Sequence, residues 1–91
     1  MINIESASRV VDALKPSFGS HDFIMAFVLS ETITYLGFVR QSHSIISANQ
    51  KIGVFLLNNA EELGIQKQGE VESENILGKI SKCALWIKEQ N

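Results

Sequence analysis

Hydrophobic residues recur at helical spacing near the start of the chain. Ala7, Val10, Val11 and Leu14 are three or four positions apart, and this pattern predicts a first helix over residues 4–14. Pro16 ends it, because the residue before a proline is pushed out of the helical region of backbone space. A short turn is predicted for residues 16–19.

A second helix is predicted from about residue 21 to the region of residue 37. Ser20 is its predicted N-cap, and Asp22 in the first turn complements the positive end of the helix dipole. One side of this helix carries Phe23, Ala26, Phe27, Thr34 and Phe38. The nearly opposite side carries Met25, Leu29, Ile33 and Leu36. A helix that is apolar on two sides is buried on two sides, so the first helix or a second copy of the chain is expected to cover the second side. Residues 32–35 also favour β structure, which leaves an extended conformation open there.

The third predicted helix runs over residues 47–63. Ser47 and Gln50 have the spacing of a capping box, in which two side chains bind free N–H groups of the first turn. Its apolar stripe consists of Ile52, Phe55, Leu56, Ala60 and Leu63. Gly64 suits a left-handed C-cap, and Ile65 can make the hydrophobic contact that accompanies such a cap.

The C-terminal part of the chain fits two patterns. As a hairpin, residues 70–74 form one strand, residues 75–79 a loop, and residues 82–88 the approximate return strand. As a helix from residue 74, the apolar positions Ile76, Leu77, Ile80, Cys83, Ala84 and Ile87 fit the helical period at least as well. Gly78 would cost about 1 kcal/mol inside a helix, whereas in a loop it supplies a positive φ. Periodicity alone leaves both structures open, and the order of the elements favours the hairpin.

This order of elements resembles a winged-helix domain over residues 20–90. NQKIGVFLLNNAEELGI resembles the last helix of that fold, and QKQGEVESENILGKISKCALWIK resembles its wing. The segments SHDFI, KIGVFL and SENILG, with a Trp near the C-terminus, are also similar to small bacterial proteins of no assigned function, some of them encoded on mobile elements. We therefore expect one small α+β domain over residues 1–91, mostly helical, with three helices followed by a C-terminal β-hairpin.

Composition and charge narrow the choice of function. The chain has 91 residues, 45% of them hydrophobic and 20% charged, and a net charge of −2. From residue 40 onward six bases are balanced by six acids, whereas a nucleic-acid-binding region usually has a basic excess. A single cysteine excludes an intrachain disulfide and suits a reducing compartment. The N-terminus has no signal-peptide pattern, and no apolar run is long enough to span a membrane. We expect a cytoplasmic protein without a membrane partner.

The outer face of the third helix carries two different kinds of residue. The winged-helix resemblance implies that this helix enters the DNA major groove, with the wing near the DNA backbone. The residues for that role are Asn49, Gln50, Lys51 and Asn58, with Lys79 and Lys82 on the wing. Asn and Gln can read adenine, and lysine can contact phosphate. Glu61 and Glu62 repel phosphate, however, and the helix has no arginine.

Val54 and Leu57 on the same face favour a protein contact. They are three positions apart and form an apolar patch if they are exposed. Another element of the chain covers them, or a second copy does, or the face reads DNA. The expected interface residues are Val54, Leu57, Met25, Leu29 and Leu36. The leading interpretation is a self-associating, dimeric binding or adaptor module, and the alternative is a weak winged-helix DNA-binding transcription regulator. The sequence identifies neither a small-molecule ligand nor the cellular process.

No residue pattern predicts catalysis, a metal site or a cofactor. His21 and His43 lack further ligands at zinc-site spacing, and both are expected to be solvated. Cys83 lies in an apolar pattern typical of a small core residue. Glu70, Glu72 and Glu74 are predicted to share a solvated strand face. The phosphate-binding patterns GxGxxG and GxxxxGK[ST] do not occur. We expect a protein that is not an enzyme.

Overall fold

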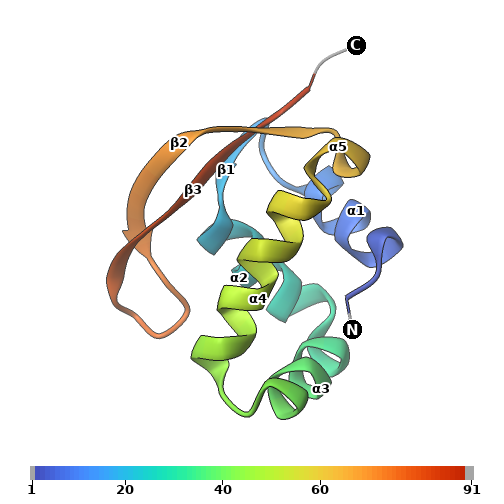
Figure 1. The fold of residues 1–91 in the computed structure, drawn as a ribbon, viewed down its shortest axis with the longest axis vertical. Helices are drawn as coiled ribbons and strands as arrows, with labels where there is room; N and C mark the ends of the chain where they lie inside the picture. The colour runs from blue at the N-terminus through green and yellow to red at the C-terminus, as the bar shows by residue number, and fades with distance from the viewer. Residues whose placement is uncertain (1, 90–91) are drawn as a thin grey trace.

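Helices gather against one side of a twisted antiparallel sheet in the computed structural model, which describes residues 2–89 (Figure 1). These residues form α1 (Ile4–Ala13), β1 (Ser17–Gly19), α2 (Ser20–Ser30), α3 (Thr32–Ser42), α4 (Ile45–Asn58), α5 (Ala60–Leu63), β2 (Ile65–Glu74) and β3 (Ile80–Lys88). The predicted α+β class and the C-terminal hairpin are confirmed. The prediction of three helices is wrong, because the described residues contain five.

The first helix matches its prediction closely. Asn3 is its N-cap, and the Asn3 side-chain oxygen accepts a hydrogen bond from the backbone N–H of Ser6 at 2.7 Å. Ala7, Val10 and Val11 are buried. The turn predicted for residues 16–19 is wrong in part, since residues 17–19 form β1 and pair with β3. The strand is too short to show an alternating pattern.

The single second helix that the sequence predicts is instead two helices. α2 and α3 meet at Glu31 with a bend of 114°. Two hydroxyl groups bond back to helix carbonyls beside this break: Ser30 Oγ donates to Ala26 O at 2.8 Å, and Thr32 Oγ1 donates to Val28 O at 2.6 Å. Such bonds bend helices, because they compete with the regular backbone pattern. The extended alternative for residues 32–35 is wrong, since these residues lie in α3.

The predicted N-caps of the later helices are each displaced toward the N-terminus. α2 has Gly19 as its N-cap, and the Asp22 carboxylate accepts a hydrogen bond from the Gly19 N–H at 2.8 Å. α4 begins at Ile45, and Ser44 is its N-cap. The Ser44 hydroxyl accepts from the Ser47 N–H at 3.0 Å, so Ser47 lies inside the helix and does not cap it.

The third predicted helix is also divided, near its C-terminal end, into two helices. α4 ends at Asn58, and Asn59 is its C-cap. The Asn59 side-chain amide donates to the Phe55 carbonyl at 2.8 Å, and the short helix α5 follows. Gly64 has φ of +68°, so the left-handed cap predicted there is confirmed.

The sheet has the order β1-β3-β2, with antiparallel pairing throughout. β2 is longer than predicted, and its register shifts between Lys67 and Glu70. The hairpin turn is closed by Asn75, whose side-chain oxygen accepts from the N–H groups of Leu77 and Lys79 at 2.9 and 3.1 Å. Gly78 has φ of +80°, as predicted for the loop, and the helical alternative for this segment is wrong.

The core lies between the helices and the sheet. Its largest fully buried side chains are Trp86, Phe23, Phe27, Ile52, Leu56 and Ile65. No buried side-chain nitrogen or oxygen atom of residues 2–89 lacks a hydrogen-bond partner. None of the described helices has by itself the length and apolar composition to cross a membrane. α2 and α3 meet both criteria only when taken together, across their bend.

Candidate binding cleft

A cleft of about 600 Å³ lies between α4 and the β2–β3 hairpin, with the start of α2 at its base. Figure 1 shows the backbone of the β2–β3 hairpin curling toward the N-terminal end of α4. The α4 wall consists of Ile46, Asn49, Gln50, Gly53, Val54 and Leu57. The opposite wall and base include Ile76, Leu77, Lys82, Cys83, Ala84 and Trp86 from the hairpin, and Ser20, His21 and Ile24 from α2.

The α4 wall follows from the helical period. Positions 46, 50, 53 and 57 are three or four residues apart and share a face, while Ala48, Ile52 and Leu56 face the core. Val54 is 55% exposed and Leu57 is 56% exposed. No helix or strand within residues 2–89 therefore covers these two side chains, which excludes the first of the three alternatives for this face.

His21 joins the start of α2 to both strands of the hairpin. Its Nδ1 lies 2.8 Å from Ser73 Oγ, and its Nε2 lies 3.4 Å from Ser81 Oγ. The expectation of a solvated histidine is wrong, because the side chain is half-buried. Sequence reasoning missed this contact, since the two serines are 52 and 60 positions away.

His21 lies among polar side chains from both strands of the hairpin. Ser73 Oγ lies 3.8 Å from Cys83 Sγ, so a histidine, two hydroxyls and a thiol are neighbours. A catalytic histidine is usually oriented by a third group through one nitrogen, which leaves the other free for the nucleophile. Each His21 nitrogen contacts a serine hydroxyl, and no carboxylate of residues 2–89 lies within 4.0 Å of the ring. No cluster of three or more His, Cys, Asp or Glu side chains able to hold a metal occurs in the described part of the chain.

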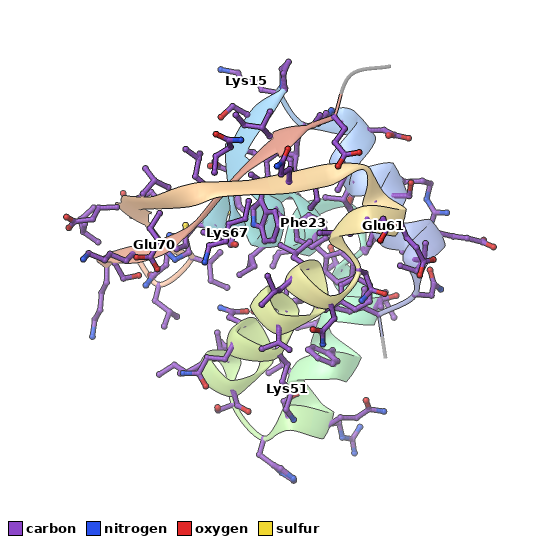
Figure 2. The ribbon with its side chains drawn as sticks, turned by 45° about the horizontal axis from the view of Figure 1, so that its top comes forward. Lys15, Phe23, Lys51, Glu61, Lys67 and Glu70 are labelled. Carbon is purple, nitrogen blue, oxygen red and sulfur yellow. The ribbon has the colours of Figure 1, made fainter. Side chains whose placement is uncertain are left out.

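The charged residues that line the cleft are Lys67 and Lys82. Figure 2 shows Lys67 beneath β2, on the side of the strand toward the helices. Within residues 2–89 no Asp or Glu lines the cleft. The ion pair of these residues, Arg9–Glu31 at 3.4 Å, lies outside the cleft and involves neither lysine. The charge of the cleft lining is therefore positive, although the whole chain is slightly acidic.

Asn49 is held in place from behind by Tyr35. The Tyr35 hydroxyl donates to Asn49 Oδ1 at 2.8 Å, which fixes the side chain at the edge of the cleft. Burial raises the pKa of Tyr35 above its ordinary value of 10.0, and the hydrogen bond with Asn49 opposes this effect in part.

Residues expected to bind DNA are only partly brought together. Asn49, Gln50 and Lys82 line the cleft, whereas Lys51, Asn58 and Lys79 do not. Lys51 Nζ lies 3.5 Å from Ser42 Oγ at the end of α3, so it is directed away from the cleft. These six residues do not form one continuous basic surface.

The expected interface residues divide into two groups. Val54 and Leu57 line the cleft, while Met25, Leu29 and Leu36 lie on α2 and α3 and do not. The exposed fractions of Met25, Leu29 and Leu36 are 43%, 74% and 58%. Sequence reasoning missed Lys67, Leu77 and Trp86 as cleft residues, because they come from the hairpin and only the folded chain brings them near α4. Gly53 was detectable, since it falls within the stripe that contains Val54 and Leu57.

Comparisons of the chain with protein-family models, with curated proteins and with solved structures find no match.

Proposed function

We propose that the protein is a non-enzymatic binding module that self-associates as a dimer through the outer face of α4. The exposure of Val54 and Leu57, each more than half accessible on an otherwise regular helix, carries this proposal. Apolar side chains that stand together on a surface favour contact with another protein.

The charge of α4 favours a second copy of the chain as the partner. Lys51 is the helix's one charged residue, and its ammonium group is directed toward Ser42 on α3. Two copies of the outer face therefore do not repel each other when they meet about a twofold axis. Gly53 supports close approach, because no atom lies within 4 Å of a Cβ placed there.

A stable dimer buries about 1,200–2,000 Å² in total, which is more than one short helix provides. Met25, Leu29 and Leu36 supply further exposed apolar surface on α2 and α3. We propose that they extend the contact. The single free cysteine, Cys83, supports a reducing, cytoplasmic setting for the module.

Sedimentation velocity of the wild type and of Leu57→Glu tests this function. We expect the wild type to dimerise at micromolar concentration and Leu57→Glu to remain a monomer, because a carboxylate at the contact is costly to desolvate. Gln66→Glu is the charge control, since it adds the same charge at an exposed position of β2 outside the proposed contact and should still dimerise. A wild type that stays monomeric at high concentration would overturn the proposal.

A second candidate function is weak DNA binding. The sheet order β1-β3-β2, with a helix directly before the hairpin, resembles the winged-helix arrangement and supports it. The proposed contacts are Asn49, Gln50, Lys51 and Asn58 on α4, with Lys79 and Lys82 on the hairpin.

Fluorescence anisotropy with a mixed-sequence duplex, at about 50 and 200 mM salt, tests this candidate. DNA binding predicts an affinity that falls steeply with salt. The triple variant with Lys51, Lys79 and Lys82 replaced by alanine should lower the slope by about one unit per lost phosphate contact. Binding that is absent at both salt concentrations would remove DNA from consideration.

A further inference from the structure

We propose that the cleft between α4 and the hairpin binds a small organic carboxylate with an apolar body. This inference goes beyond self-association and does not depend on it. It rests on the size of the cleft, its lining and the sign of its charge.

The size and lining suit a small molecule. A volume of about 600 Å³ lies within the range of about 300–1,000 Å³ that is usual for ligand sites. Val54 and Leu57, each more than half exposed, and the partly buried Ile76 supply its apolar surface, and the buried side chains of Ile24 and Trp86 border it. These side chains favour a ligand whose body is hydrocarbon.

The charge of the lining favours an anionic head group. Two ammonium groups, those of Lys67 and Lys82, belong to the lining, and the structure places no carboxylate of residues 2–89 within 4.0 Å of either one. Glu72 is the cross-strand partner of Lys82 and Glu70 that of Ala84, so both share a face with Lys82, but neither carboxylate lines the cleft. A ligand carboxylate can form a charge-assisted hydrogen bond with either lysine, whereas a cationic ligand is repelled by both.

Several polar groups around the cleft are already fixed by the fold. Trp86 Nε1 donates to Ser20 Oγ at 2.9 Å, and the Tyr35 hydroxyl holds Asn49 at 2.8 Å. His21 contacts a serine on each strand of the hairpin, which ties that wall to α2. The cleft is thus largely formed before a ligand enters, and the ordering cost of binding is correspondingly small.

Calorimetric titration with decanoate tests the proposal, at a protein concentration where sedimentation shows a monomer. Decanoate should bind saturably and change the fluorescence of Trp86, the chain's one tryptophan. Decanol has the same chain without the charge, and decylammonium has the opposite charge. We expect both to bind at least about fivefold more weakly, given the usual strength of exposed charge pairs. Equal binding of all three compounds would overturn the assignment of a carboxylate.

Two glycines provide a matched pair for locating the site. Gly53 and Gly37 both lie within helices, and a Cβ at either position meets no atom within 4 Å. Gly53→Leu places a side chain in the cleft and should weaken decanoate binding about tenfold or more. Gly37→Leu makes the same replacement on α3, outside the cleft, and should bind as the wild type does. Unchanged binding by Gly53→Leu would show that decanoate binds elsewhere and would overturn the proposal.

The lysines are tested in the same way. Lys67→Met with Lys82→Met should weaken decanoate binding about fivefold to tenfold and leave decanol binding unchanged. Lys79→Met is the control, because Lys79 lies in the hairpin turn and does not line the cleft. If Lys79→Met weakens binding as strongly as the double variant, the attraction comes from the overall charge, and the two-lysine site is wrong.

Discussion

Single side chains connect segments that are distant in the sequence. Trp86 on β3 is 1% exposed, and its indole N–H donates to the hydroxyl of Ser20, 66 positions earlier. Ser20 was predicted as a helix cap from its neighbours alone. Its observed role depends on β3 and is not visible in the local pattern, which explains why sequence reasoning assigned a different partner.

The hydrogen bond between Trp86 and Ser20 should contribute measurably to stability. We expect Trp86→Phe to lower the free energy of unfolding by about 2 kcal/mol and Ser20→Ala by about 1 kcal/mol, because each removes a partner of a buried bond. In a double-mutant cycle the coupling should be about 1 kcal/mol. Urea unfolding measures these values, and a coupling near zero would show that the bond adds nothing beyond packing.

Tyr35 gives the protein a dependence on alkaline pH. Burial raises the pKa of Tyr35 above its ordinary value of 10.0, so above that pH the unfolded chain loses its tyrosine proton more readily than the folded one. The free energy of unfolding is unaffected by this group below pH 10.0 and falls as pH rises through the folded-state pKa. Urea unfolding between about pH 9 and 11 should show a smaller loss for Tyr35→Phe than for the wild type. A parallel loss in both proteins would assign the alkaline effect to other groups.

At the scale of elements, helix existence was predictable and helix ends were not. The apolar periodicity of α1 and α4 reports burial directly, and the hairpin turn has local signals in Asn75 and Gly78. The breaks at Glu31 and Asn59 lie beside Ser, Thr and Asn side chains that bond back to helix carbonyls. Periodicity does not record such bonds. β1 has three residues and is held by its pairing with β3, so no local sequence pattern predicts it.

Two helices end at a residue with a positive φ, and only one of these two residues is a glycine. His43 ends α3 with φ of +70°, and Gly64 ends α5 with φ of +68°. His43→Gly should raise the free energy of unfolding by about 0.5–1 kcal/mol, because glycine adopts this conformation without strain. Gly64→Ala should lower it by about 1 kcal/mol for the converse reason.

Gly37→Ala is the internal control for these helix-end variants. The position lies within α3, where alanine favours the helix by about 1 kcal/mol relative to glycine. Thermal and urea unfolding of the three variants should therefore give two gains and one loss. A gain for Gly64→Ala would contradict the left-handed cap at the end of α5.

At the scale of the whole molecule, only one of the two walls of the candidate cleft could be predicted from the sequence. Its α4 wall follows from one helical face, where Val54 and Leu57 were identified from their spacing, and Asn49 and Gln50 through the winged-helix resemblance. The other wall comes from a hairpin whose twist and tilt depend on long-range contacts such as His21 with Ser73. The positive lining is likewise a property of the fold, because in the sequence three glutamates, at positions 70, 72 and 74, stand between Lys67 and Lys82.

The proposed dimer and the proposed ligand use the same wall of the cleft, so dimerisation and ligand binding should compete. If Val54 and Leu57 are buried between two copies, decanoate binds the monomer and not the dimer. Ligand at ten times its dissociation constant then stabilises each monomer by a factor of about 11 and raises the dimer dissociation constant about 120-fold. Sedimentation equilibrium with and without decanoate measures this shift, and decylammonium should produce almost none. Gly37→Leu should respond as the wild type does. A dimer that is unaffected by saturating decanoate would mean that self-association uses the α2–α3 residues Met25, Leu29 and Leu36, with the cleft left open to its ligand.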